Sequence, residues 1–339
     1  MGRGPMLACH TEPGSYLAHL PRAFLSHSVL YCLGSLLFLA TQLSWADEAV
    51  DWLNRAATAA RQLNYSGIYV YHHGEHVEVM RVSHRKDAMG EQEKVEVLDE
   101  LPRQYLRVDK DVYCQLPDGK TVRVEKNTTR RFFPALLPNN PESLQRFYNI
   151  KLNGSERVAG INCQIVSLQP RDGYRHGYQL WLDKRTGLPL KSHIVNSNGG
   201  IVSMFVFSEI QIGRAPDPQI FRQDLAGKKV VMASLGQTPS PVSSAWEITP
   251  PPGYAPVLEA NRPLFGKKLP VTHWVFSDGL SVMSLFIEPD GDTSAGTQGL
   301  SADGAMSVYS RQLDGHRITT LGEVPNSALI QTGNSVRKK

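Results

Sequence analysis

The sequence has few cysteines, no strong excess of either charge and no apolar run long enough to cross a membrane. Four cysteines in 339 residues exclude a small domain held together by disulfide bonds. The 36 Lys and Arg residues and 32 Asp and Glu residues give a formal charge of +4, so the composition predicts no nucleic-acid partner. An apolar fraction of 41% is large enough for a sizeable core and excludes a largely disordered chain. The length favours two domains over one.

The motifs of common enzyme classes are also missing. The sequence contains no G-x-S-x-G elbow, P-loop or G-x-G-x-x-G. Residues 87–100 are acidic, but their alternating polar spacing is typical of a solvated strand rather than of paired catalytic carboxylates. We therefore expect neither a catalytic site nor a cofactor.

Four histidines lie in or beside one predicted hairpin: His72, His73, His76 and His84. His72 and His73 should point to opposite faces of their strand. Neither H-E-x-x-H nor a Cys/His zinc spacing accompanies them. We interpret them as exposed hairpin residues and expect no metal site.

The amino-terminal segment is typical of a secretion signal. Arg22 is followed by a charge-free stretch that includes the apolar residues 29–40. A membrane span needs about 20 apolar residues, whereas this shorter run suits the apolar region of a signal peptide. Ser44 and Ala46 are small residues at the positions of a cleavage site. We expect residues 1–46 to be a signal peptide; an uncleaved anchor is the alternative.

Removal of this leader leaves two cysteines, Cys114 and Cys163. An even pair in an exported chain is a disulfide candidate, and both cysteines lie in predicted strands. We predict that they are bridged. Two buried thiols are the alternative, and a metal site is disfavoured because no further cysteine or paired histidine is near either one.

The remaining chain reads as a mainly β, α+β protein. Apolar residues at steps of three or four predict a helix from Asp47 to Leu63. Strands follow as far as Gly213, interrupted by helical segments at residues 132–137 and 141–147, and predict one large antiparallel sheet. The domains are therefore expected at residues 47–213 and 253–339. Residues 214–252, which contain two proline-rich stretches, form a linker region between them.

Two predicted strands are apolar on both faces. These are residues 68–71 and 201–207, whereas an antiparallel strand usually has one polar face unless something covers it. An ordinary core, an interface between sheets and a ligand pocket all explain this pattern. The pattern alone favours the core over the pocket.

Several long motifs resemble the RseB/MucB family. They are found at residues 65–87, 96–107, 132–138, 157–192, 205–213, 273–289 and 322–325. The most specific is the stretch 157–192, RVAGINCQIVSLQPRDGYRHGYQLWLDKRTGLPLKS. It departs from the family pattern at His176, where a tyrosine is usual, and the Cys114/Cys163 pair is not expected in every member. The resemblance covers nearly all of the chain after residue 46.

The resemblance implies a periplasmic negative regulator of sigma-E (envelope stress) signalling, with no enzymatic activity. The first domain would be a curved half-barrel plugged by helices, similar to the lipoprotein carriers LolA and LolB. The second, a smaller α+β domain, would bind the periplasmic segment of a transmembrane anti-sigma factor of the RseA/MucA type. Binding shields that segment from proteolysis, and a lipid-like ligand such as lipopolysaccharide or lipoprotein releases it. A lipoprotein carrier is the main alternative, an exported hydrolase is a weaker one, and homo-oligomerisation is left open.

This resemblance favours a pocket on the large sheet, and strand alternation then gives candidate residues for two sites. The expected lining of the lipid pocket is Ile68, Val70, Met80, Val82, Phe132, Phe133 and Leu136. The candidate aromatic anchors for the partner are Trp274, Phe276 and Phe286. The core of the small domain is the alternative location for at least two of these three.

Overall fold

A computed structural model describes residues 47–99, 103–116, 118–126, 131–223, 225–233, 245–262, 269–290 and 298–339. The predicted signal peptide lies outside these residues. Within them, no helix combines the length and apolar character needed to span a membrane.

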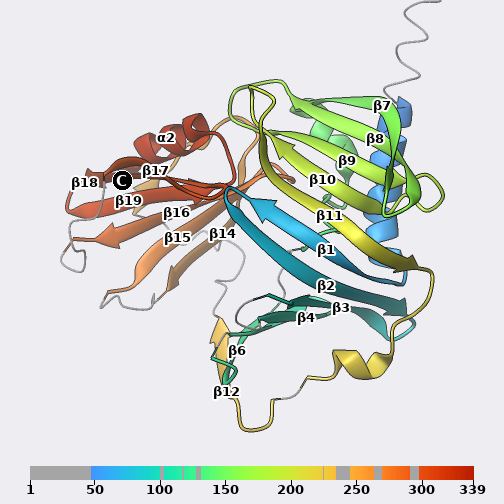
Figure 1. The fold of residues 1–339 in the computed structure, drawn as a ribbon. Coiled ribbons are helices and arrows are strands. Elements are labelled where there is room, and N and C mark those ends of the chain that lie inside the picture. Colours follow the sequence, from blue (N-terminus) through green and yellow to red (C-terminus); the bar gives the residue numbers. More distant parts are fainter. Residues whose placement is uncertain are drawn as a thin grey trace, which may run out of the picture. The chain divides into compact units, whose positions relative to one another are not determined.

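The described part of the chain begins with the predicted helix, which covers residues 47–62. The helix packs one face against the large sheet (Figure 1). Its apolar positions recur every three or four residues, so Val50, Leu53 and Ala57 are all buried. They contact a cluster that includes Leu180 and Leu182 from the sheet. The helix predicted from the sequence is confirmed.

The large sheet has twelve strands in the order β12-β6-β5-β4-β3-β2-β1-β11-β10-β9-β8-β7. Their bounds are β1 (Tyr65–His73), β2 (His76–Asp87), β3 (Gly90–Val97), β4 (Gln104–Val108), β5 (Asp111–Gln115), β6 (Thr121–Glu125), β7 (Tyr148–Val158), β8 (Ile161–Pro170), β9 (Gly177–Asp183), β10 (Pro189–Val195), β11 (Ile201–Ile212) and β12 (Lys229–Ala233). All pairs are antiparallel except β12 with β6. The expected large antiparallel sheet is confirmed, and β12 extends it into the region predicted as a linker.

Two short 3₁₀ helices connect strands of this sheet, η1 (Pro141–Arg146) and η2 (Pro218–Phe221). The first lies where a helical segment was predicted. The other predicted segment, residues 132–137, is not helical. The stretch starts with two phenylalanines, contains Pro134 and is followed by Pro138. It forms a loop whose apolar side chains fill the inner face of the sheet.

The second part of the chain forms a six-stranded antiparallel sheet in the order β14-β15-β16-β19-β18-β17. Its elements are β14 (Ala255–Arg262), β15 (Val271–Ser277), β16 (Val282–Pro289), β17 (Gly299–Asp303), β18 (Met306–Leu313), β19 (His316–Gly322) and helix α2 (Asn326–Ser335). The helix packs Ala328 and Leu329 against Phe276, Leu285 and Ile318. A small ladder of β13 (Trp246–Glu247) and β20 (Arg337–Lys338) lies beside it. The expected smaller α+β unit is confirmed.

The predicted disulfide is wrong, because Cys114 and Cys163 are not joined in the structure. Cys114 lies on β5 and Cys163 on β8, and seven strands separate β5 from β8 in the sheet. With about 4.8 Å between neighbouring strands, this separation far exceeds the Cα–Cα distance of roughly 7 Å that a disulfide tolerates. An even number of cysteines in a sequence carries no information about this distance.

Thiol labelling tests the correction directly. A chain of residues 47–339 contains only these two cysteines, and we expect two labelled thiols per chain after denaturation without reductant. In the native protein Cys163 should react slowly, because it is fully buried and burial raises the pKa of its thiol to about 11. Mass spectrometry of the labelled chain gives the number of labels. Fewer than two labels per chain would indicate that the two cysteines are bridged.

Candidate functional site

An aromatic cluster covers the inner face of the large sheet, the face toward the N-terminal helix. At its centre Tyr69 of β1 contacts Phe133 of the loop that precedes η1, with ring centroids 5.3 Å apart. Phe133 stacks on Phe205 of β11 at 5.2 Å and also contacts Phe207 at 5.3 Å. Phe133 and Phe207 are each about 1% exposed. Side chains from distant parts of the sequence thus form one apolar surface on this face.

Five of the seven predicted pocket residues belong to this surface. Val82 and Phe133 are buried in the cluster, and three others pack against it half-buried: Met80, Phe132 and Leu136. The other two, Ile68 and Val70, lie on the opposite face. In the register of β1 and β2, Tyr69 is paired with Met80, whereas Ile68 is paired with Arg81. Paired residues share a face, so Tyr69 and Tyr71, rather than Ile68 and Val70, point inward from this part of β1.

A row of polar and charged side chains crosses the same inner face next to the aromatic cluster. Tyr65, His84, Glu93 and Arg107 are successive cross-strand neighbours on β1 to β4. All four are buried. The Tyr65 and His84 rings stack at 4.7 Å, and the Arg107–Glu93 ion pair measures 3.5 Å. Sequence analysis missed this row and placed His84 among exposed histidines; its side chain is 1% exposed.

Two glutamates in this region have pKa values shifted in opposite directions. Burial raises the pKa of Glu93, although His84 and Arg107 oppose the shift. Burial also acts to raise the pKa of Glu91, but hydrogen bonds from His84 and Arg131 outweigh it and lower that pKa to about 2. Glu91 is therefore ionised in the folded protein at any pH above this value.

The lowered pKa of Glu91 predicts a loss of stability in acid. A carboxylate with a depressed pKa contributes its stabilisation above the pKa of the unfolded chain, and this is lost as the pH falls through the folded value. Between pH of about 4.5 and 2, Glu91 should contribute a loss of roughly 2–3 kcal/mol. Across this window the free energy of unfolding, measured with urea, should depend less on pH in Glu91→Gln than in the wild type. Glu96→Gln, on the other face of β3, is the control; equal slopes for wild type and Glu91→Gln would contradict the assignment.

A buried ion pair joins the large sheet to the small one. Residues 45–339 form one compact unit, and Arg175, in the loop before β9, donates from Nε to Asp278, which follows β15, at 2.7 Å. Both side chains are completely buried. A second guanidinium nitrogen of Arg175 donates to the carbonyl of Pro252 at 2.5 Å. The guanidinium also lies 4.4 Å above the Phe147 ring.

Asp278 is held by further donors from both parts of the chain. Its Oδ1 accepts the backbone N–H of Ser281 at 2.7 Å. Its Oδ2 accepts from the Tyr148 hydroxyl of β7 at 3.3 Å. The Tyr178 hydroxyl of β9 lies 3.3 Å from the Ser281 hydroxyl. The charge of Asp278 is thereby compensated on all sides, which a buried ion pair requires.

A second contact between the two sheets lies at the tips of two hairpins. Tyr71 of β1 donates to Glu323, just after β19, at 2.9 Å. Gly74 and Gly304 occupy the two hairpin turns, each with a φ of +58°. A Cβ on Gly74 would lie 2.5 Å from the Cα of Gly304, so both backbones approach as closely as glycine allows. Burial raises the pKa of Glu323.

The three predicted partner anchors do not share one surface. Phe276 is buried in the core under α2, and Trp274 packs against that core with its ring stacked 5.9 Å from Phe276. Phe286 lies on the other face of the sheet, half-buried, where it stacks on His273 at 4.2 Å. Of the three, Phe286 alone is directed away from α2.

Two β-sheets with an aromatic inner face and a buried joint have the architecture of a β-rich binding protein. Family comparisons agree: residues 48–226 match the MucB/RseB N-terminal domain and residues 240–337 match the MucB/RseB C-terminal domain. The chain belongs to the MucB/RseB family.

Individual relatives cover nearly the whole chain. The sigma factor AlgU regulatory protein MucB of Pseudomonas aeruginosa is 31% identical over 323 residues, which are 91% of this chain and 96% of that protein. The sigma-E factor regulatory protein RseB of Escherichia coli K12 is 23% identical over 308 residues, which are 90% and 95%. MucB in the solved Pseudomonas aeruginosa MucA/MucB complex superposes with a TM-score of 0.70 at 29% identity, covering 86% of this chain and 99% of that one.

Proposed function

We propose that this chain is a periplasmic regulator of sigma-E-type signalling that binds the periplasmic segment of a transmembrane anti-sigma factor. The observation that carries the proposal is the likeness to MucB through both sheets. A second MucB structure, described as a complex with MucA(peri), has a TM-score of 0.69 and covers 86% of this chain. Because the likeness includes the small sheet, it favours a regulator over a carrier, which needs only the large one.

A lipid-like signal is proposed to act on the inner face of the large sheet. The half-buried side chains that pack around the aromatic cluster, among them Met80, Phe132 and Leu136, offer apolar contacts for acyl chains. Such a ligand releases the anti-sigma segment only if it binds the free regulator more tightly than the complex. Lipopolysaccharide and lipoprotein both combine acyl chains with a polar portion and fit this requirement.

The partner is tested by capture and protection. Purified chain, immobilised, should retain an anti-sigma factor from solubilised inner membranes of the same bacterium. Added to the isolated periplasmic segment of that protein, it should slow cleavage by the protease that initiates its degradation. Acyl-chain binding without any protection would contradict the regulator and favour a carrier.

Met80 and Val70 provide a test position and a control position for the lipid site, because they lie on opposite faces of adjacent strands. We expect Met80→Asp to weaken binding of a fluorescent acyl-chain probe by about tenfold or more, since an unpaired carboxylate on an apolar surface is costly. Met80→Leu keeps the apolar volume and should bind normally. Val70→Asp, on the outer face, should also bind normally. Urea unfolding checks that each variant is folded, and equal losses for Met80→Asp and Val70→Asp would exclude the inner face as the site.

A further inference from the structure

The side chain of Tyr71 belongs both to the proposed lipid face and to a contact between the two sheets. Its ring stacks on Phe205 with centroids 4.3 Å apart, and Phe205 stacks in turn on Phe133 at 5.2 Å. Its hydroxyl donates to Glu323, just after β19 of the small sheet, at 2.9 Å. One side chain therefore connects the aromatic cluster of the large sheet to the small sheet.

This contact is closely fitted and depends on the position of the Tyr71 ring. His73 stacks on the other side of the contact, 4.6 Å from Tyr71, and a Cβ on Gly304 would lie only 2.9 Å from its Nδ1. Burial raises the pKa of Glu323, and the hydrogen bond from Tyr71 opposes this shift. A hydrogen bond weakens steeply when it is lengthened or misaligned. A displaced Tyr71 ring would thus leave Glu323 without this donor, which is costly for a desolvated carboxylate.

The buried ion pair between the sheets belongs to a different part of the core. Tyr148 and Tyr178, which surround Asp278 and Ser281, lie in the cluster that packs under the N-terminal helix. Tyr71 instead packs against the aromatic cluster. The ion pair can therefore keep the two sheets joined while the Tyr71 contact forms or breaks.

We infer that Tyr71 couples the lipid face to the small sheet: an acyl chain bound beside Met80 displaces the Tyr71 ring and breaks its hydrogen bond to Glu323. This inference rests on the proposed function, because it explains how a ligand on the large sheet releases the anti-sigma segment. Met80 is paired with Tyr69, two residues from Tyr71 on the same face, so a chain against Met80 also reaches the Tyr71 ring. Tyr71 and Phe205 are half-buried at the border of the cluster, and they move without opening its buried centre.

The ligand and the hydrogen bond then compete, and this competition has a measurable form. If the acyl chain lowers the affinity for the anti-sigma segment by some factor, the segment lowers the affinity for the acyl chain by the same factor. The hydroxyl of Tyr71 favours the state that binds the segment. Its removal should therefore weaken binding of the segment and strengthen binding of the acyl chain, whereas misfolding would weaken both.

Tyr71→Phe tests the inference, because it keeps the ring and its stack on Phe205 and removes only the hydroxyl. Calorimetry of the whole mature chain gives the dissociation constant of a synthetic peptide of the anti-sigma segment, with and without a saturating dansyl-labelled fatty acid. The fatty acid should raise this constant about tenfold in the wild type and less than about twofold in Tyr71→Phe. Glu323→Gln keeps an oxygen that accepts from the hydroxyl and should retain most of the coupling, whereas Glu323→Ala should lose it.

A second measurement does not need the anti-sigma segment. In the wild type the bound fatty acid should speed amide hydrogen exchange in residues 316–335, which cover β19 and α2. In Tyr71→Phe exchange of these residues should already be faster without ligand, and the fatty acid should change it little. Mass spectrometry of peptides from the exchanged chain gives the rates.

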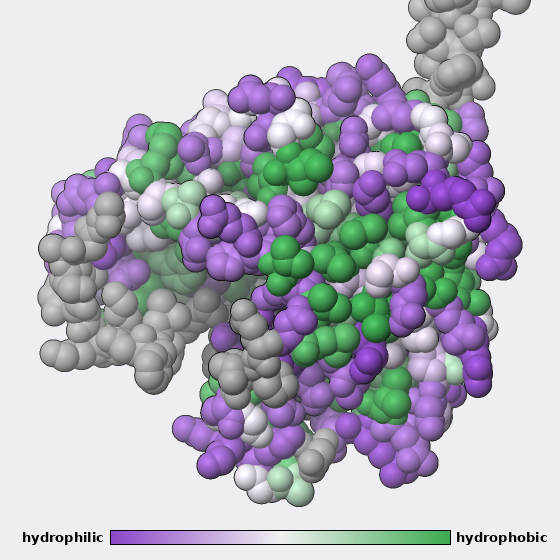
Figure 2. All heavy atoms as spheres, in the orientation of Figure 1, coloured by the Kyte–Doolittle hydropathy of each residue, from purple (hydrophilic) through white to green (hydrophobic). Residues whose placement is uncertain are grey.

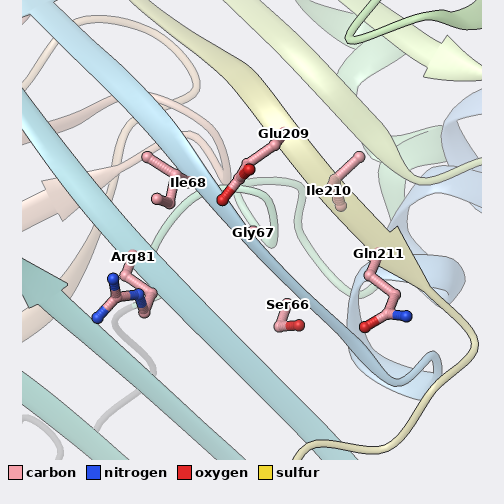
Figure 3. A pocket seen from close by; sticks show the side chains of 7 residues that line it. All are labelled: Ser66, Gly67, Ile68, Arg81, Glu209, Ile210 and Gln211. Atoms are coloured by element: carbon pink, nitrogen blue, oxygen red, sulfur yellow. The ribbon is translucent and has the colours of Figure 1, made fainter.

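Two controls come from the same strand. Tyr65→Phe also removes a hydroxyl, but this hydroxyl donates to the carbonyl of Ala60 in the N-terminal helix at 3.1 Å, so the coupling should not change. Ile68→Ala weakens β1 from its outer face, the face opposite the N-terminal helix, where hydrophobic side chains gather over β1, β2 and β11 in Figure 2. Figure 3 shows Ile68 between Arg81 and Glu209 at a hollow of this face. Ile68→Ala should lower the free energy of unfolding in urea and leave the coupling intact.

The outcomes separate this inference from the proposed function. If Tyr71→Phe keeps the coupling of the wild type, or if Tyr65→Phe loses as much of it, the inference is overturned and the regulator proposal stands. A wild type that binds the fatty acid and the peptide independently, or that fails to bind one of them, would overturn both.

Discussion

Replacing Arg175 or Asp278 by alanine is expected to lower the free energy of unfolding by about 3–5 kcal/mol. Each change leaves the other charge completely buried and without its main partner. The loss of Asp278 also removes the acceptor of Tyr148, and the loss of Arg175 removes the donor to Pro252. Because these groups come from both sheets, the variants should also let the two sheets move apart.

Urea unfolding followed by tryptophan fluorescence measures the effect. Asp172→Ala is the matched control: Asp172 pairs with the same arginine but is 29% exposed, so its loss should cost at most about 1 kcal/mol. The double variant Arg175→Met/Asp278→Leu removes both charges together and should be more stable than either single variant. Single variants no less stable than Asp172→Ala would show that the ion pair does not hold the joint.

Phe133→Ala should have a comparably large effect, about 3–5 kcal/mol, because it opens a cavity among packed aromatic rings. Phe133 contacts Tyr69, Phe205 and Phe207. These rings come from β1 and β11, which pair at the centre of the large sheet. The same cavity should change binding of the acyl-chain probe, since it alters the proposed surface.

The adjacent Phe132 provides the control, with the same chemistry on the same loop. It is half-buried and packs against Tyr105 at 4.9 Å, so Phe132→Ala should cost clearly less, roughly 1–2 kcal/mol. Thermal or urea unfolding of the two variants side by side decides the comparison. If Phe132→Ala were the more damaging of the two, the centre of the cluster would lie elsewhere.

The face of β1 shows what a sequence pattern can and cannot determine. Alternation correctly separates Ile68 and Val70 from Tyr69 and Tyr71, but all four are apolar, so hydrophobicity does not tell which pair points inward. On β2, Val82 is apolar and Arg81 is charged, and this difference does show which of the two points inward. Only the register between the two strands transfers that information to β1.

The strands with the weakest sequence pattern are the edges of the two main sheets. They are β7, β12, β14 and β17. Edge strands bury fewer side chains and carry more polar residues, which weakens the alternation that predicts a strand. In β7, residues 153–157 are polar or glycine, whereas the central strands β9 and β10 are mostly buried. Strand prediction here therefore worked for the interior of each sheet.

The buried joint could not be predicted because it depends on contacts between distant residues. Arg175 and Asp278 are 103 positions apart, and each lies in a turn where charged residues are common. The long motif at residues 157–192 indicated the family but not the role of its arginine. Only packing of the two sheets distinguishes this arginine from the solvent-exposed ones.

The pairing of β1 with β11 has a consequence for how the chain folds. Tyr65 meets Ile212 in this seam, so the second strand of the central pair is synthesised long after the first. Until then one edge of β1 and its tyrosines lack their partner, and contacts of such long sequence separation form slowly. An exposed edge of this kind is prone to pairing with other chains. Slow emergence of the chain, during synthesis or transport, would therefore lengthen the period in which it depends on chaperones.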